Sequence, residues 1–237
     1  MKINQELLSE LMTDDGHIGS VKYLPEIEKL PRREGTIALL EKMGADNVIH
    51  IGCCGHLHNI QKQMENGTHF HAMLNSNFKK VIGFDINAEA VKYLSTFDIP
   101  DVYAYNFVED TEEVEKIIET AFSNEDYTIL LPEVLEHIPN PVDFLERIKA
   151  YHRRGNNRIL ITVPNAYGFG RVRDALLRNT ESINMDHKYM FTPTTIMKVM
   201  CMAGIIPEEI YFLDLYKYSK LFKKPILGNT IVVIGKL

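Results

Sequence analysis

The feature that most constrains this chain is the alternation of short apolar runs with longer segments of helical periodicity. Runs rich in β-branched and aromatic residues predict strands at residues 47–51, 80–85, 102–105, 127–131, 158–163, 209–213 and 230–234. Most of these runs are continuously apolar, which is typical of strands buried on both faces of a parallel sheet. Between them, apolar spacing predicts helices at residues 87–95, 111–122, 141–153 and 192–203. This alternation predicts an α/β fold with a doubly wound, mostly parallel sheet.

Residues 1–44 precede the first predicted strand and carry two further helical patterns. One is an apolar stripe that begins at Ile3 and ends at Leu11, and the other runs from residue 32 to residue 43. Two interpretations are open, namely a pair of packing helices or a lid over a site. The predicted organisation is therefore an N-terminal helical segment, residues 1–44, followed by one α/β domain, residues 45–237.

Charge and cysteine content exclude several classes of protein. The net charge of −6 disfavours tight, sequence-independent nucleic-acid binding, which needs a basic field. Three cysteines, two of them adjacent, do not make a disulfide framework and favour a reducing cytoplasm. No run approaches the roughly 18 apolar residues of a membrane span, and the first residues lack the apolar core of a signal peptide. We therefore expect a cytoplasmic protein without membrane insertion, and the oligomeric state, a homodimer included, stays open.

Small and acidic residues follow the first two predicted strands. The first strand leads into Ile51-Gly52-Cys53-Cys54-Gly55-His56, and small residues at such a turn let a ligand approach the backbone closely. The second strand ends in Asp85, whose carboxylate could accept hydrogen bonds from both ribose hydroxyls. The alternative role for Asp85 is to cap the helix that follows. Together, on adjacent strands, the two features point to a nucleoside cofactor.

Four segments, VIHIGCCGH, VIGFDIN, LPEVLEHIPNP and ITVPN, occur in the order found in class I S-adenosylmethionine-dependent methyltransferases. Residues 45–235 resemble that family, and residues 184–191 are similar to it as well. The resemblance implies a seven-stranded Rossmann-like sheet with an antiparallel last strand, S-adenosyl-L-methionine as the cofactor, and methyl transfer as the activity. It places Gly52, Cys53 and Gly55 at the methionine part of the cofactor, Asp85 at the ribose, Ile86 beside the adenine, and Asn106 and Phe107 near the adenine amino group.

The chain departs from the family pattern in the first motif. His50 occupies the position of the family's acid, and Cys54 and His56 replace later glycines. The gap from Gly52 to Asp85 exceeds the roughly 20 residues typical of dinucleotide folds. We therefore expect an additional loop or helix within residues 56–77.

Two carboxylates and an imidazole follow the fourth predicted strand, at Glu133, Glu136 and His137. In a helix, positions i, i+3 and i+4 share a face, and such a set can bind a divalent metal. With the distant His187, the pattern resembles metal-dependent O-methyltransferases, such as small-RNA 2′-O-methyltransferases and ubiquinone-pathway enzymes. That resemblance implies Glu133, Glu136, His137 and His187 as ligands of Mg²⁺, Mn²⁺, Zn²⁺ or Fe²⁺. Without a metal, His137 is the first candidate for a general base and His187 the second.

Other histidines and basic residues gather in short clusters. Two His-x-His pairs, His56/His58 and His69/His71, are expected on the surface or in substrate-facing loops. Basic residues gather on residues 171–178 and again on residues 217–224, as solvated faces or as a local anchor for a phosphate or an anionic sugar.

The sequence predicts an S-adenosylmethionine-dependent methyltransferase that acts on a hydroxyl of a small-molecule acceptor. A sugar, a nucleotide-sugar or another glycan building block is the expected acceptor, by analogy with similar enzymes. The alternative enzyme is an RNA or quinone-type metal-dependent O-methyltransferase, and the net charge counts against RNA. A nicotinamide-dependent oxidoreductase would need a fuller Gly-x-Gly-x-x-Gly loop. A catalytically degenerate methyltransferase fold that binds a partner is the non-enzymatic alternative.

Overall fold

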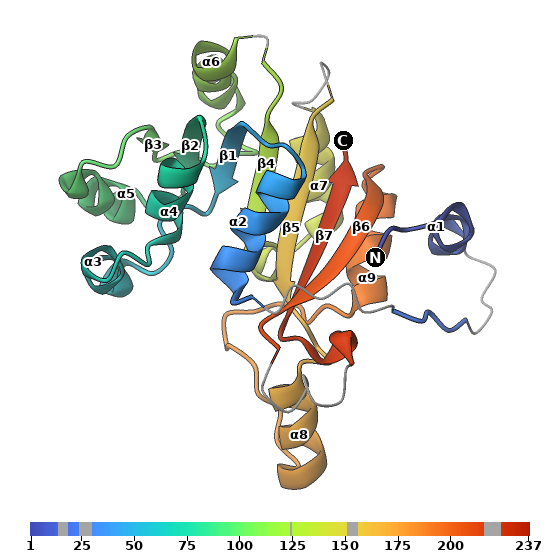
Figure 1. Ribbon diagram of the computed structural model, residues 1–237. Helices are drawn as coiled ribbons and strands as arrows, with labels where there is room; N and C mark the ends of the chain where they lie inside the picture. The colour runs from blue at the N-terminus through green and yellow to red at the C-terminus, as the bar shows by residue number, and fades with distance from the viewer. Residues whose placement is uncertain (14–18, 24–29, 124, 151–155, 216–223) are drawn as a thin grey trace.

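Seven strands form one sheet with the order β3-β2-β1-β4-β5-β7-β6 (Figure 1). The computed structural model describes residues 1–13, 19–23, 30–123, 125–150, 156–215 and 224–237. The strands are β1 Asn47–Ile51, β2 Lys80–Phe84, β3 Val102–Tyr103, β4 Thr128–Pro132, β5 Arg158–Pro164, β6 Ile206–Leu213 and β7 Thr230–Lys236. Only β7 runs antiparallel to its neighbours β5 and β6, and the other pairs are parallel. The predicted doubly wound sheet with an antiparallel last strand is confirmed.

The strands are apolar throughout because both faces of the sheet are covered. Side chains alternate between the faces, so Leu130 and Leu160 pack toward one helical layer while Ile129 and Ile161 pack toward the other. All four side chains are fully buried. This is why the strand segments of the sequence read as continuous apolar runs rather than as alternating ones.

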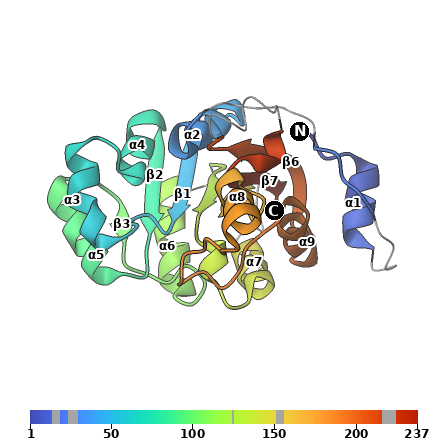
Figure 2. The same ribbon diagram turned by 90° about the horizontal axis from the view of Figure 1, so that it is seen from below.

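The helices form a layer on each face of the sheet, as the two views show (Figures 1 and 2). One layer contains α2 and α4, whose apolar side chains join one core cluster. The other contains α6, α7 and α9, while α3 and α5 pack together beside β2 and β3. The helices are α1 Gln5–Met12, α2 Arg32–Lys42, α3 Leu57–Glu65, α4 Phe70–Asn77, α5 Ala88–Leu94, α6 Thr111–Phe122, α7 Pro141–Ala150, α8 Phe169–Arg178 and α9 Pro193–Met202.

Both helical patterns of the N-terminal segment form helices, α1 and α2. The first packs against α9, with Leu11 buried and the terminal amine donating to the carbonyl of Ile210, 2.8 Å away. The second lies on the sheet through Ile37, Leu39 and Leu40. Only α2 therefore reaches the carboxyl ends of the strands.

Some elements differ from the prediction. The expected extra segment after the first strand forms two helices, α3 and α4. Helix α8, which projects beyond the carboxyl edge of the sheet (Figure 1), was not predicted. Strand β3 is shorter than expected, and residues 151–153 of a predicted helix lie outside the described residues. In the part of the chain that the structure describes, no helix is long and apolar enough to cross a membrane.

Candidate functional site

A cavity of about 400 Å³ opens at the carboxyl ends of β1, β4 and β5. This is where the strand order reverses, and open α/β sheets bind ligands at such a point. The volume lies within the range of small-molecule sites, roughly 300–1,000 Å³. The lining includes side chains from α2, the loop after β1, the start of α4 and the loops after β4 and β5, namely Arg32, Arg33, Thr36, His50, Cys53, Cys54, His56, Gln63, His69, Phe70, Glu133, Glu136, His137, Arg171, Asn184 and His187.

The loop after β1 is held in place by the next strand. Gly52 adopts a positive φ of 75°, and its backbone N–H donates to the carbonyl of Phe84. The backbone N–H of Cys54 donates to Asp85 Oδ2 at 2.9 Å, and that of Asn87 donates to Asp85 Oδ1 at 2.9 Å. A carboxylate has about four lone-pair sites, so Asp85 keeps acceptor capacity for a ligand. The helix cap is Asn87 rather than Asp85, because the Asn87 side chain accepts from the backbone of Ala90.

The two cysteines of this loop are buried and pack against α3 and α5. Burial raises the pKa of the Cys53 thiol well above its usual value. The thiol is therefore protonated near neutral pH and packs as a small apolar group. Cys53, Cys54 and Asp85 also form a group of potential metal ligands within 4.8 Å of one another.

The residues expected around the adenine take separate positions at the same edge of the sheet. Ile86 is exposed, with 79% of its surface accessible, while Phe107 is buried and packs edge-to-face on Phe84 at 5.3 Å. Asn106 closes a local turn, in which its Oδ1 accepts from the backbone of Val108 at 3.2 Å. None of these three side chains lines the 400 Å³ cavity.

Three buried histidines lie beneath the loop after β1. His50 and His71 approach each other at 3.2 Å between their Nδ1 atoms, and His69 Nε2 lies 3.4 Å from the carbonyl of Cys54. Burial lowers the pKa of His71 to about 3 and that of His50 well below its usual value, so both rings are neutral. The expectation that His69 and His71 lie on the surface or in a substrate-facing loop is therefore wrong for His71, which is fully buried away from the cavity. His69 is buried as well, although it lines the cavity. The cause is the length of the inserted segment, which folds back as α4 under the loop.

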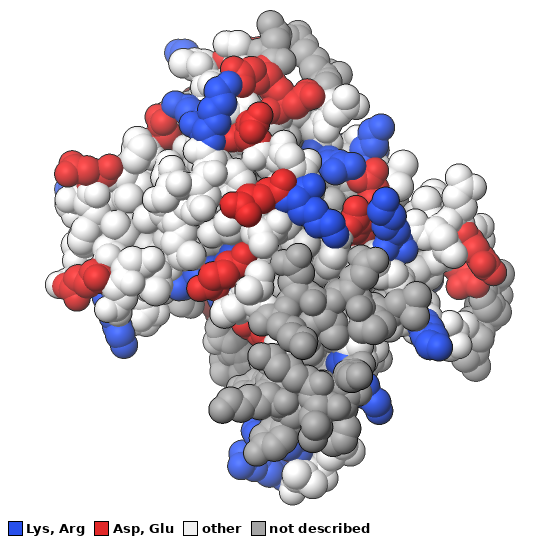
Figure 3. Space-filling model, viewed as in Figure 1, with Lys and Arg blue, Asp and Glu red and all other residues white. Residues whose placement is uncertain are grey.

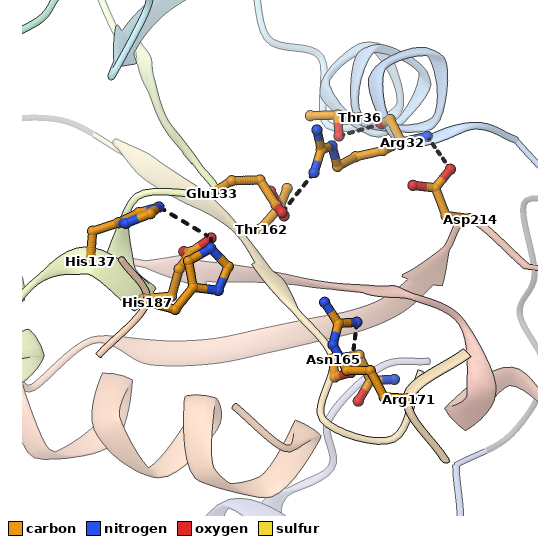
Figure 4. A network of polar contacts seen from close by, with 10 residues as sticks. Arg32, Thr36, Glu133, His137, Thr162, Asn165, Arg171, His187 and Asp214 are labelled. Carbon is orange, nitrogen blue, oxygen red and sulfur yellow. Dashed lines mark hydrogen bonds and ion pairs between the residues drawn. The ribbon is translucent and has the colours of Figure 1, made fainter. Parts of the chain in front are cut away.

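Glu133 lies apart from the other residues of the Glu-x-x-Glu-His segment. Its φ of 53° starts a tight turn, and its carboxylate points to α2, where Arg32 Nη1 is 2.6 Å away (Figure 4). The hydroxyl of Thr162 on β5 donates to the same carboxylate at 3.0 Å. The segment forms only a single 3₁₀ turn, Leu135–His137, so the helix face that would group the three side chains does not form.

Glu136, His137 and His187 come together from distant parts of the sequence. The Nε2 atoms of His137 and His187 lie 4.0 and 3.9 Å from Glu136 Oε1. The two rings meet edge-to-face at 4.7 Å between centroids. The backbone carbonyl of Glu136 accepts from the N–H groups of Lys188 and Tyr189, which fixes the loop that carries His187.

The carboxylate of Glu136 is fully buried, and neither of its oxygens has a hydrogen-bond partner in the described part of the chain. Burial, and then the charge of Glu133, raise the pKa of Glu136 to about 8. Burial also lowers the pKa of His187, with the charge of His137 adding to that effect. A buried polar group without a partner is costly, and one explanation for such a group is a ligand that completes it.

Two of the three ligand separations in this cluster are compatible with one divalent cation, and the third is within 4.8 Å. Ligand atoms on opposite sides of one ion are at most about 4.2 Å apart, twice the Zn–N distance of about 2.1 Å. The distances of 3.9 and 4.0 Å from the two imidazole Nε2 atoms to Glu136 Oε1 are too long for hydrogen bonds, but they are shorter than this 4.2 Å limit. A set of one carboxylate and two imidazoles suits Mn²⁺, Fe²⁺ or Zn²⁺ better than it suits Ca²⁺. Glu133 is not within the 4.8 Å group that these atoms form.

Helix α2 contributes residues that the sequence did not single out. Arg32, Arg33 and Thr36 line the cavity from the first turns of this helix. Their sequence signal was weak, since Pro31-Arg32-Arg33 reads as an ordinary helix start. Of the expected basic clusters, Arg171 reaches the cavity, whereas Lys217, Lys220 and Lys223 lie outside the described residues.

Comparison with known proteins gives a match at the level of structure. No model of a known protein family and no curated protein matches the chain. A methyltransferase from Archaeoglobus fulgidus that depends on S-adenosylmethionine (SAM) aligns with a TM-score of 0.55 and 15% identity, over 86% of this chain and 94% of that one. The methyltransferase domain of bacterial CtHen1-CN aligns with a TM-score of 0.52 and 18% identity, over 87% and 97% of the two chains.

A third similar structure is the small RNA methyltransferase HEN1, with a TM-score of 0.55 and 12% identity. The match covers 90% of this chain and 27% of HEN1, so the present chain corresponds to about a quarter of that protein. At these identities the likeness shows the fold. The chain therefore has the class I fold of SAM-dependent methyltransferases.

Proposed function

We propose that the chain is a SAM-dependent methyltransferase that methylates a hydroxyl of a small polar acceptor. The observation that carries the proposal is the 400 Å³ cavity at the strand-order reversal. It joins the loop after β1 to the Glu136, His137 and His187 cluster. A sugar, a nucleotide-sugar or another glycan building block is the acceptor class we favour, in a cytoplasmic setting. A catalytically degenerate, binding-only protein is the competing proposal.

The proposed cofactor site uses the residues at the ends of β1 and β2. Gly52, Cys53 and Gly55 would contact the methionine part of the cofactor, because the loop backbone borders the cavity. Asp85 would accept the ribose hydroxyls with the lone pairs that Cys54 and Asn87 leave free. Ile86, Asn106 and Phe107, which follow β2 and β3 outside the 400 Å³ cavity, would border the adenine.

The proposed chemistry is a direct displacement. SAM, when bound, would supply an activated methyl group, which the acceptor oxygen would take as the sulfur–methyl bond breaks and the sulfonium becomes a neutral thioether. The proton of the hydroxyl passes to an imidazole of His187 or His137. Burial lowers the pKa of His187, so its ring is neutral and able to accept a proton near neutral pH. The protein otherwise has to align the two reactants in a dry site.

The proposed metal ligands are Glu136, His137 and His187, with Glu133 as a further candidate that would have to leave Arg32. A bound divalent ion would acidify the attacking hydroxyl. The buried carboxylate without a partner supports this assignment. In the absence of a metal, His137 and His187 would act as bases beside a protonated Glu136.

An RNA acceptor is the second candidate, and the likeness to the small RNA methyltransferase HEN1 favours it. Charge speaks against it. The net charge is −6, and Figure 3 shows Lys and Arg interspersed with Asp and Glu over the coloured part of one face. A continuous basic field, which RNA binding draws on, is not visible among the residues coloured there.

The test is a calorimetric titration of S-adenosylhomocysteine into the full chain and three variants. We expect micromolar binding to the wild type, and weakening by about 100-fold in Asp85→Ala, because charge-assisted hydrogen bonds are worth about 1.5–3 kcal/mol each. Asp85→Asn keeps one carbonyl acceptor and should weaken binding less. Asp143→Ala, which removes an exposed partner of Arg147, is the matched control and should bind like the wild type.

Well-folded wild-type protein that fails to bind S-adenosylhomocysteine, with and without Mn²⁺, would overturn the proposal. Binding without turnover on any hydroxyl acceptor, small molecule or RNA, would favour the binding-only protein.

A further inference from the structure

The described arginines divide into those that pair with a carboxylate and those that do not. Arg32, Arg147, Arg158, Arg173 and Arg178 each have a carboxylate oxygen within 4.0 Å. Among the described residues, Arg33 and Arg171 have none, and both line the 400 Å³ cavity. Two arginines without counter-charges thus face the same hollow, in a chain whose net charge is −6.

The guanidinium of Arg171 is fixed by the end of β5. Its Nη1 donates to the backbone carbonyl of Asn165 at 3.3 Å (Figure 4), and the Asn165 side chain is held by the carbonyls of Ile226 and Gly228. Its Nε is buried and has no hydrogen-bond partner in the described part of the chain. The guanidinium of Arg171 is therefore held in place and still has an N–H donor without an acceptor. Leaving a buried donor unsatisfied costs free energy.

Arg171 belongs to the acceptor half of the cavity rather than to the cofactor loop. It is carried by α8, after β5, and lines the cavity together with His187. Arg33 lies on α2, where its Nη1 donates to the carbonyl of Thr68 at 2.6 Å. A ligand in the cavity would therefore border two arginines.

We propose that Arg171 binds an oxyanion of the methyl acceptor, a phosphate or a carboxylate, so that the substrate class is an anionic hydroxy compound. The inference rests on the proposed function, because it assigns the acceptor half of that site. The planar guanidinium matches both oxyanions through two parallel N–H donors, which a lysine cannot offer. An acceptor anchored there would carry its reacting hydroxyl toward Glu136 and the two histidines.

The local charge balance agrees with an anionic ligand. Arg32, Glu133 and Thr162 form a closed set, so they contribute no free charge to the cavity. Arg33 and Arg171, which have no carboxylate partner among the described residues, add positive charge to the cavity, and this charge would draw an anion in and repel a cation.

The experiment measures oxyanion binding to protein already saturated with S-adenosylhomocysteine, in EDTA so that no metal can hold the anion. Inorganic phosphate and acetate are titrated separately and followed by calorimetry. We expect millimolar or tighter binding of at least one probe to the wild type, and about a 10- to 100-fold loss in Arg171→Gln. Arg171→Lys keeps the charge without the fork and should fall between the two. Arg178→Gln, on the exposed end of the same helix, is the matched control and should bind the anion like the wild type.

Three outcomes would overturn the inference. Equal anion binding by wild type and Arg171→Gln means that the anion lies elsewhere. No saturable binding of either probe by the wild type means that the cavity does not select oxyanions. Loss of S-adenosylhomocysteine affinity in Arg171→Gln would assign the arginine to the carboxylate of the cofactor instead. If the wild type does not bind S-adenosylhomocysteine at all, the proposed function itself is wrong. That result differs from the three outcomes above, in which S-adenosylhomocysteine binds to the wild type.

Discussion

At the level of single residues, Glu136 and Glu133 differ in their surroundings in the fold, although they belong to the same sequence motif. The two residues lie three positions apart in one motif. Arg32 and Thr162 hold the carboxylate of Glu133, whereas that of Glu136 is buried and has no hydrogen-bond partner in the described part of the chain. The sequence predicts a ligand set that includes both, because spacing along a helix is visible in sequence and a distant arginine is not. Which of the two carboxylates would hold a metal stays a prediction, and the variants below decide it.

We expect Glu136→Gln to lose Mn²⁺ affinity and Glu133→Gln to keep it. Loss of a direct ligand should weaken Mn²⁺ binding by more than the roughly 10- to 100-fold that outer-shell changes cost. Glu133→Gln should change the affinity by less than about 10-fold, because its carboxylate already pairs with Arg32. The measurement is a Mn²⁺ titration of each variant, followed by electron paramagnetic resonance. Equal losses in both variants would instead make Glu133 a ligand.

The same titration has a defined pH dependence. Burial and the charge of Glu133 raise the pKa of Glu136 to about 8, so below that pH a proton occupies the carboxylate that a metal needs. Affinity for Mn²⁺ should therefore rise about tenfold per pH unit between pH 6 and pH 8 and level off above it. Glu133→Gln removes one cause of the raised pKa, so the levelling should move to lower pH. A flat profile across this range would exclude Glu136 as the group that titrates.

At the level of elements, the strands were predictable and the helix after β5 was not. Continuous apolar runs mark strands that are covered on both faces, and β1 was predicted to the residue. Helix α8 has apolar residues at helical spacing, Phe169, Val172 and Leu176, but it projects away from the core (Figure 1). Leu176 and Leu177 are each 78% accessible and Asp174 is buried. Strand β3, an edge strand that pairs only with β2, is shorter than predicted.

The contact between the loop after β1 and the turn after β4 is invisible in sequence, and it makes Gly52 and Gly55 unequal. Both have a positive φ, 75° and 64°. A Cβ on Gly52 would lie 2.6 Å from Val134 Cγ2, whereas a Cβ on Gly55 would meet nothing within 4 Å. Val134 directly precedes the 3₁₀ turn that carries Glu136 and His137. Substitution of Gly55 therefore tests backbone strain alone. Substitution of Gly52 tests strain together with the contact between the loop after β1 and the turn after β4.

We expect Gly52→Ala to lower the free energy of unfolding by about 3 kcal/mol, from left-handed strain of about 1–2 kcal/mol and overpacking of about 1–3 kcal/mol. Gly55→Ala should cost only the strain, about 1 kcal/mol. Urea unfolding of both variants measures the difference, and S-adenosylhomocysteine titration should show a larger loss of affinity in Gly52→Ala. Equal destabilisation by the two substitutions would mean that Val134 yields without cost.

At the level of the whole molecule, the site depends on segments far apart in the sequence that meet at one edge of the sheet. Helix α2 precedes β1, the Glu136 turn follows β4, and His187 follows α8. The order of strands predicts this edge as the ligand site, but it does not reveal that the N-terminal segment splits in function. Helix α1 packs on α9, and α2 lines the cavity.

This division gives a prediction for hydrogen exchange with and without S-adenosylhomocysteine. At a ligand concentration 100 times Kd, binding stabilises the folded state by about 2.7 kcal/mol, so amides that exchange only by global unfolding should slow about 100-fold. Central strands β4 and β5 belong to that group because their side chains are buried. Residues 52–56 and 133–137 should slow as well, since they border the ligand.

Helix α1 should keep its exchange rate if it opens locally, because none of its residues lines the cavity. Mass spectrometry of peptides from these segments makes the comparison in one experiment. Asp85→Ala is the matched control, because the same ligand concentration is only about equal to its expected Kd and should slow exchange by about twofold rather than 100-fold. Slowing of α1 to the same extent as the central strands would show that the N-terminal segment folds and opens with the site as one unit. The lid is favoured over the packing helix where α1 exchanges faster than the central strands without ligand and slows when the ligand binds, because local opening of α1 and binding then exclude one another.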